Sequence, residues 1–282
     1  MPGQAGARLQ WAMEAAKTAG RAALRNLRRG GFGMEDDDLH ISRINTAWSM
    51  VREAHGNHTA MQGAQERLLE RYGGAVRRYA LSALRNEDAA EEVFQEFALK
   101  FVRGDFGNAN PERGKFRAFV KTIVYRLIVD YQRRAKKLGR EGAMHSNMPD
   151  PEDSAESKDE DAMFRASWRD ELLAGVWQKL ADDEQRSGKP YHTVLRYRVA
   201  HPDLRSPELA EGLSEELGKV INAGAVRVLL HRARELFAEL LLDEVTQSLE
   251  SGSLDEAEQE LIDLELHEYC RPALEKRREK KN

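Results

Sequence analysis

Apolar residues recur at steps of three and four positions along most of the chain between Thr46 and Leu242, and signals for β-strands are nearly absent. Glycine and proline gather at a few joints between these stretches. Spacing of this kind places apolar side chains on one side of a helix, where they pack into a core. The sequence therefore predicts an all-α protein.

Two helical blocks are expected, separated by an acidic stretch. Residues 149–162 read PDPEDSAESKDEDA, with seven acidic residues and one lysine. Low hydrophobicity and high like charge cannot offset the entropy cost of ordering, so this stretch is expected to be a flexible linker. We expect five parts: a disordered or partly helical N-terminal extension (1–45), a first small helical domain (46–140), the acidic linker (141–163), a second small helical domain (164–245) and an acidic C-terminal extension with a basic end (246–282).

Charge is segregated along the chain although the net charge is only −4. Residues 113–140 contain ten basic residues and one acid, whereas residues 243–270 contain ten acids and no lysine or arginine. The acidic stretch keeps helical apolar spacing, so a short amphipathic helix is expected there. Two interpretations of it stay open. It is either a solubilising tail or a segment that docks on a basic surface and holds the protein inactive.

The basic stretch contains a predicted helix, FRAFVKTIVYRLIVDYQRRAKK, which follows a loop rich in glycine, asparagine and proline at 104–114. One side of this helix is apolar and is expected to face the core: Phe116, Val120, Ile123, Leu127 and Tyr131. Arg117, Lys121 and Tyr125 follow one another at steps of four on another side, which is expected to face solvent. Cations bind phosphates and an aromatic ring stacks on an unpaired base, so this face suits single-stranded DNA. The alternative is an ordinary solvated surface helix.

In the second block, Ser206-Pro207-Glu208 predicts a helix start with Ser206 as N-cap, and this helix is expected to end near Gly218. Asn222 is expected to cap the next helix. Basic residues lie opposite the apolar side of that next helix. A short turn that joins two helices, with basic residues on the second, is typical of a helix-turn-helix whose second helix enters the major groove. The basic residues are Arg227, His231, Arg232 and Arg234.

The segment DAAEEVFQEFALKFVRG (88–104), followed by FRAFVKTIVYRLIVDYQRR (116–134), resembles region 2 of the sigma-70 family in its extracytoplasmic-function branch. Asn86 and the two acids after it predict the helix start, and Val93, Phe94, Phe97 and Phe101 form the predicted buried stripe. Ala98 and Val102 replace the family's usual Phe and Trp and are candidate core positions. The resemblance implies that the acidic helix docks on a coiled coil of the largest RNA polymerase subunit through Glu91, Glu92, Gln95, Glu96 and Arg103.

The same resemblance implies that the loop and the basic helix recognise the −10 promoter element as single-stranded DNA. Tyr125-Arg126 stands where Arg-Asn is common in the family. The candidate residues for this interface are Asn108, Asn110, Lys115, Arg117, Lys121, Tyr125 and Arg126.

Further along, AVRVLLHRARELFAELL (225–241) resembles sigma region 4. This resemblance implies that Arg227, His231, Arg232 and Arg234 contact the −35 element as duplex DNA. Together the two resemblances imply a sigma factor that directs promoter-specific transcription initiation. Its expected partners are core RNA polymerase and promoter DNA, with an anti-sigma factor as a further candidate. Two alternatives stay open: a helix-turn-helix transcriptional regulator without a sigma role, and a module that occupies polymerase without starting transcription.

Other classes of function find little support in the sequence. Cys270 is the single cysteine, so an intrachain disulfide is excluded and a reducing cytoplasm is the expected location. No apolar run approaches the ~18 residues that a membrane span needs. The chain has no phosphate-binding glycine loop and no acid–base or metal-ligand constellation. We therefore expect no enzyme activity, no catalytic residue, no metal, no cofactor and no membrane partner.

Overall fold

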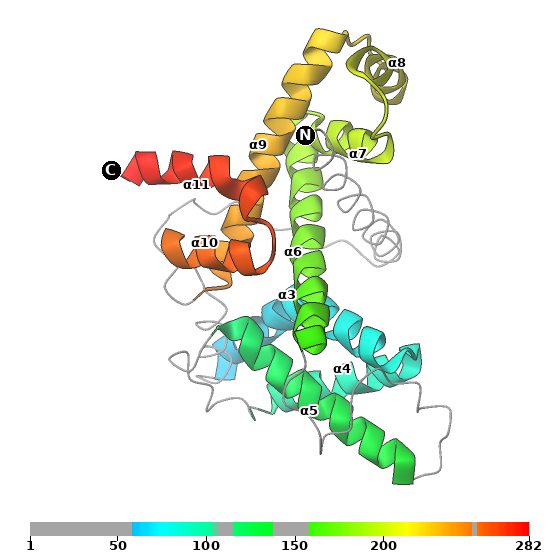
Figure 1. Ribbon diagram of the computed structural model, residues 1–282, viewed down its shortest axis with the longest axis vertical. Helices are drawn as coiled ribbons and strands as arrows, with labels where there is room; N and C mark the ends of the chain where they lie inside the picture. The colour runs from blue at the N-terminus through cyan, green and yellow to red at the C-terminus, as the bar shows by residue number, and fades with distance from the viewer. Residues whose placement is uncertain (1–57, 104, 106–114, 138–157, 250–252, 282) are drawn as a thin grey trace. The chain divides into compact units, whose positions relative to one another are not determined.

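The computed structural model describes residues 58–103, 105, 115–137, 158–249 and 253–281. These residues form α-helices and contain no β-strand, which confirms the predicted all-α class. Within these ranges no helix is long and apolar enough to cross a membrane. The helices are α3 (His58–Leu84), α4 (Glu87–Val102), α5 (Phe116–Lys137), α6 (Lys158–Ser187), α7 (Tyr191–Ala200), α8 (Ser206–Leu217), α9 (Ala223–Gln247), α10 (Leu254–Asp263) and α11 (His267–Lys281) (Figure 1).

The described helices divide between two compact units. The N-terminal unit comprises Arg43–Leu172 and Val245–Glu268, and thus contains α3, α4, α5, the first half of α6 and α10. The C-terminal unit includes Leu173–Glu244 and Tyr269–Asn282, and thus contains the second half of α6, α7, α8, most of α9 and most of α11. The division between Glu244 and Val245 lies within one residue of the expected boundary at 245, whereas the units also divide α6 after Leu172 and the expected C-terminal extension after Glu268.

An aromatic cluster explains why the first half of α6 joins the N-terminal unit. Trp168 of α6 stacks on Tyr72 of α3 with ring centroids 4.8 Å apart, and Phe116 of α5 lies 5.1 Å from the same tyrosine. Phe164 meets Tyr79 edge-on at 5.0 Å. Burial of such large rings against α3 and α5 stabilises this half of α6 within the N-terminal unit. The helix therefore begins at Lys158, inside the expected linker, while the rest of the linker (141–157) lies outside the described residues.

Local sequence signals determine where α4 begins and which of its sides is buried against α3 and α5. Asn86 caps the helix: its backbone is extended and its side-chain oxygen accepts a hydrogen bond of 2.9 Å from the Ala89 N–H. The predicted apolar stripe from Val93 to Phe101 is buried. The opposite side of α4 is therefore left to face outward.

In the C-terminal unit, α7, α8 and α9 enclose a small apolar core that includes Val194, Leu213 and Leu230. Gly218 ends α8 with a left-handed backbone (φ 63°), and Asn222 caps α9 by accepting a 2.8 Å hydrogen bond from the Ala225 N–H, so both predictions are confirmed. The predicted N-cap of α8 is wrong by one residue. Ser206 is the first helical residue, because the Glu208 carboxylate accepts a hydrogen bond from the backbone N–H of Arg205 and places that residue at the cap.

Candidate nucleic-acid and partner interfaces

The outward side of α4 carries three of the five residues expected to contact polymerase. Glu92, Gln95 and Arg103 are exposed. The other two take part in ion pairs within the same unit. Glu91 lies 3.0 Å from the Arg77 guanidinium, and Glu96 lies 2.6 Å from that of Arg134. The first three residues are thus directly accessible to a partner, and the last two are accessible only in competition with an arginine.

Two apolar side chains share this side of α4, and sequence reasoning missed them. Leu99 and Val102 are each 48% exposed. Val102 is therefore not a core residue as expected, and Ala98 is only half-buried. The signal was present, because Leu99 follows Gln95 by four positions and lies on the same helical side. Apolar side chains flanked by Glu92, Gln95 and Arg103 give this face the mixed character of a protein–protein contact surface.

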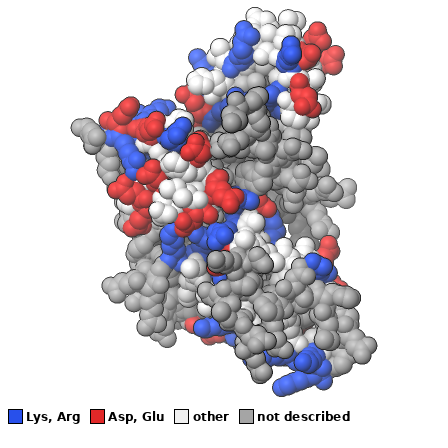
Figure 2. All heavy atoms as spheres, in the orientation of Figure 1, with Lys and Arg blue, Asp and Glu red and all other residues white. Residues whose placement is uncertain are grey.

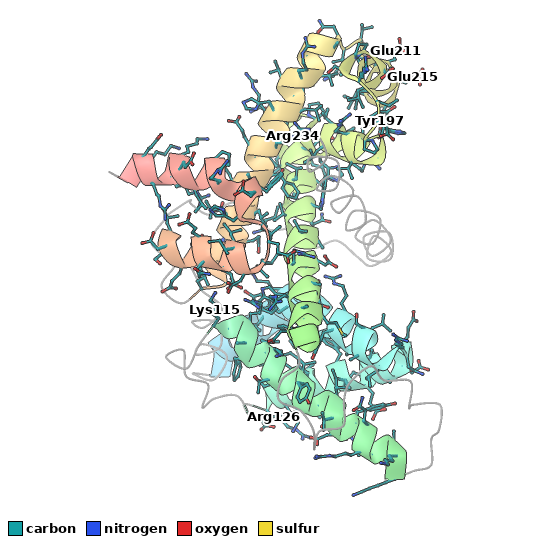
Figure 3. The ribbon with its side chains drawn as sticks, in the orientation of Figure 1. Lys115, Arg126, Tyr197, Glu211, Glu215 and Arg234 are labelled. Atoms are coloured by element: carbon teal, nitrogen blue, oxygen red, sulfur yellow. The ribbon has the colours of Figure 1, made fainter. Side chains whose placement is uncertain are left out.

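The predicted core side of α5 is confirmed: Phe116, Val120, Leu127 and Tyr131 are buried, and Ile123 is half-buried. The expected solvent-facing side is wrong. Lys121 is only 7% exposed, and Arg117 and Tyr125 are half-buried. Arg126 is exposed. Figure 3 shows Lys115 just before the start of α5 and Arg126 further along it. The two loop residues of this candidate set, Asn108 and Asn110, lie outside the described residues.

Acidic side chains from other segments cover the start of α5. The Lys115 ammonium lies 2.8 Å from a Glu260 oxygen and 2.6 Å from an Asp263 oxygen. The Arg117 guanidinium lies 2.7 Å from Glu260 and 3.4 Å from Asp263. Both acids belong to α10. Lys121 pairs with Asp161 at the start of α6. These contacts are the physical reason why the expected solvent-facing side is covered.

The network between α5 and α10 shifts the titration of its members. Burial would raise the pKa of the Asp263 carboxyl, but hydrogen bonds from Lys115 and Gln259 and the nearby cations outweigh burial and hold that pKa below its usual value. Burial likewise opposes the charged form of Lys115, yet its hydrogen bonds to Asp263 and Glu260 raise its pKa. Both partners are therefore charged at neutral pH, and the contact is ionic.

On α9 the candidate residues for duplex DNA are all exposed. Arg227, His231, Arg232 and Arg234 are exposed, and the intervening Val226, Leu230 and Ala233 are buried against the core of the C-terminal unit. The His231 ring lies 3.7 Å from Glu235. The turn at 218–222 separates this helix from α8. Arg227, His231 and Arg234 thus lie together on one side of α9, and Arg232 is exposed on the adjacent side.

A cavity of 520 Å³ adjoins this basic side at the start of α8. Arg227 and Arg234 of α9 line it together with Arg198 of α7 and Arg205 before α8, and Ser206 stands at its edge as the first residue of α8. Sequence reasoning missed Arg198 and Arg205, because nothing local links them to a residue of α9. Four arginines beside a helix N-terminus form an electrostatic environment suited to a phosphate group. Among the described residues no group of side chains could hold a metal ion.

One part of the chain is similar to a known protein family. Residues 68–138 match the family model of sigma-70 region 2. The match covers most of α3 and all of α4 and α5, so this part of the chain is similar to region 2 of sigma-70 factors. No curated protein and no solved structure gives a significant match to the chain.

Proposed function

We propose that the chain is a sigma factor of the extracytoplasmic-function branch that directs RNA polymerase to promoters. The observation that carries this proposal is the region 2 match at residues 68–138, which coincides with α3, α4 and α5. The polymerase carries out the bond-forming chemistry, and the sigma factor supplies binding surfaces. Its place of action is the cytoplasm, where promoter DNA and polymerase meet, and an anti-sigma factor is a further candidate partner.

The outward side of α4 binds core polymerase in this proposal. Glu92, Gln95 and Arg103 supply polar and charged contacts, and Leu99 with Val102 supplies apolar area that is already exposed. Hydrophobic anchors surrounded by polar groups are the usual source of affinity in such contacts. Glu91 pairs with Arg77 of α3, and Glu96 pairs with Arg134 of α5. These two acids either hold α4 against α3 and α5, or they leave their arginines and pair with cations of the polymerase.

The −10 element binds along α5 and the loop before it. Arg126 is exposed and Tyr125 half-buried, so a phosphate and an unpaired base can approach this part of α5 directly. Lys115, Arg117 and Lys121 add positive charge closer to the loop that holds Asn108 and Asn110. This assignment is supported by the charge of α5 and by the region 2 match.

The C-terminal unit binds the −35 element as duplex DNA. Arg227, His231 and Arg234 project from one side of α9 with Arg232 on the adjacent side, and an arginine that reaches a guanine edge can form two hydrogen bonds to it. The arginine-lined cavity at the start of α8 holds a backbone phosphate, which fixes the position of α9 in the groove. Contacts to phosphate position the helix and contacts to base edges specify the sequence.

A reconstituted transcription assay tests the proposal. Core polymerase is incubated with the full chain on promoter fragments from the source genome, and discrete transcripts are expected only when the chain is present. The double variant Glu92→Ala/Gln95→Ala should abolish them. Its matched control is Asp182→Ala/Gln185→Ala, which removes an acid and a glutamine at the same spacing from an exposed side of α6 and should leave transcription intact.

The alternatives predict different results. A helix-turn-helix regulator without a sigma role gives duplex binding by the chain alone and no polymerase-dependent transcripts. A module that only occupies polymerase binds the core enzyme whether or not Arg227, His231 and Arg234 are present, and it yields no transcripts. Either pattern would overturn the sigma assignment.

A further inference from the structure

The basic start of α5 is already bound by a helix of the same chain. Glu260 of α10 is only 2% exposed and contacts both Lys115 and Arg117, at 2.8 and 2.7 Å. Asp263 adds contacts to the same two cations. Figure 2 shows acidic side chains gathered over α10 with basic side chains next to them. The carboxylates of α10 thus occupy the positions that phosphates would take on these two cations.

Apolar packing holds α10 in this position as well as charge. Ala257 and Leu261 on α10 and Leu264 directly after it are buried, whereas Ile262 on the other side is exposed. Ser253 caps the helix by accepting a hydrogen bond from the Glu256 N–H. Beyond its end, Glu265 lies 2.8 Å from Arg169 of α6. The amphipathic α10 is therefore a docked part of the N-terminal unit, with its charged edge directed at α5.

Among the described residues, the three acids paired with the start of α5 lie outside the region 2 match. Glu260 and Asp263 belong to the acidic C-terminal stretch, and Asp161 belongs to the acidic segment that precedes Phe164. Three of the −10 candidates thus contact a carboxylate from outside the region 2 match: Lys115, Arg117 and Lys121. A DNA strand that binds these cations competes with the carboxylates for them.

We propose that α10 is a self-inhibitory helix that competes with the promoter strand for the basic start of α5. The proposal rests on the function proposed above, in which α5 binds the −10 element. A carboxylate and a phosphate make the same kind of charge-assisted hydrogen bonds to a guanidinium, so the two exclude each other at Arg117. A DNA strand then binds at Lys115 and Arg117 only in the fraction of molecules in which α10 has left α5, and the apparent affinity for that strand falls accordingly.

The test compares three full-length proteins in their binding to a fluorescent single-stranded DNA of mixed sequence at low salt, measured by anisotropy. Glu260→Gln/Asp263→Asn removes both carboxylate charges while keeping side-chain size, and should bind the DNA about tenfold more tightly than the unmodified chain. Glu275→Gln/Glu279→Gln is the matched control. It makes the same change in net charge at two exposed positions on α11, and its affinity should remain unchanged.

A milder variant covers the case in which the buried Glu260 tolerates no change. Asp263→Asn alone alters a side chain that is 33% exposed, and should give a smaller increase in affinity in a protein with an unchanged circular dichroism spectrum. A second readout is hydrogen exchange of the amides at 254–264. Their exchange should speed up when the unmodified chain is saturated with DNA, because α10 is then displaced.

The outcomes separate this proposal from the one it rests on. Equal, measurable DNA affinity in all variants, with unchanged exchange in α10, overturns self-inhibition and leaves DNA binding by α5 standing. Absence of DNA binding in every variant overturns the −10 role, and self-inhibition with it.

Discussion

The Arg117 guanidinium and the Glu260 carboxylate form an ion pair with a separation of 2.7 Å, and their side chains are 14% and 2% exposed. The two residues are 143 positions apart in the sequence. The pair joins α5, which carries −10 candidate residues, to α10, which follows α9 along the chain. Because a charge this poorly hydrated needs a partner, loss of either side chain should cost more than loss of an exposed ion pair.

Glu260→Ala removes the nearer carboxylate that neutralises the poorly hydrated charge of Arg117, and should lower the free energy of unfolding by about 3 kcal/mol. In a double-mutant cycle with Arg117→Ala, the two losses should be less than additive, with a coupling energy of roughly 1–3 kcal/mol. Urea unfolding followed by circular dichroism measures both quantities. Additive losses would mean that the pair contributes no interaction energy to the fold.

The exposed apolar pair on α4 predicts a binding defect without a folding defect. Leu99→Arg places a charge where a polymerase contact is proposed, and should weaken binding to core polymerase by at least about tenfold, as expected for a central apolar contact. Thermal stability should hardly change, because Leu99 is already half exposed. The measurement is a titration of labelled protein with core polymerase.

Leu81→Arg is the matched control for that experiment. Leu81 is also an exposed leucine of the same unit, but it lies on α3. Its replacement should leave polymerase affinity close to that of the unmodified chain. Equal defects in both variants would point to a general effect of added charge and not to a contact at α4.

Sequence reasoning succeeded where the deciding signal is local. The Asn86 cap and the buried stripe of α4 depend on residues within one or two helical turns, and both were predicted. Periodicity also separated the two sides of α5. It could not reveal that Lys121 is covered, because the covering Asp161 lies 40 residues away. A helical pattern shows which side is polar, but the elements that pack on that side are decided by the tertiary fold.

The same limit explains the differing unit boundaries. Composition identifies the acidic stretch, but composition does not report that Phe164 and Trp168 pack against Tyr79 and Tyr72. Trp168→Ala should therefore destabilise the N-terminal unit by about 3–5 kcal/mol, as for other buried aromatic residues. Hydrogen exchange should become faster in α3.

Trp177→Ala serves as the comparison for Trp168→Ala, because Trp177 belongs to the same helix but contacts His192 and Phe237 in the C-terminal unit. Its removal should speed exchange in α7 and α9 and leave α3 unchanged. Identical exchange patterns in the two variants would contradict the division of α6 between two units.

A close contact between α7 and α8 predicts the effect of a single methyl group. A Cβ added at Gly212 would overlap the hydroxyl and ring of Tyr197. Gly212→Ala should thus destabilise the C-terminal unit by about 1–3 kcal/mol through overpacking, although alanine is the better helix former. Gly175→Ala on α6 is the control, since a Cβ there meets nothing within 4 Å. It should raise stability by up to about 1 kcal/mol. Thermal unfolding compares the two variants.

The single cysteine gives a prediction about pH. Cys270 is buried in the C-terminal unit, and burial raises the pKa of its thiol from an ordinary value of 9.0 to about 12, with Arg277 opposing the shift. Because the thiolate is the nucleophile, iodoacetamide should modify the folded chain near neutral pH far more slowly than the urea-unfolded chain. Mass spectrometry of the alkylated protein measures both rates.

The same shift fixes the sign of a stability change. Above pH 9 the unfolded chain loses the Cys270 proton while the folded chain keeps it, so deprotonation favours unfolding. The contribution is fully present below pH 9 and is lost as the pH rises towards 12. The unmodified chain should therefore lose more stability between pH 8 and pH 10.5 than Cys270→Ala, which has no thiol to titrate. Equal losses in the two proteins would show that the Cys270 thiol ionises as readily in the folded state as in the unfolded state.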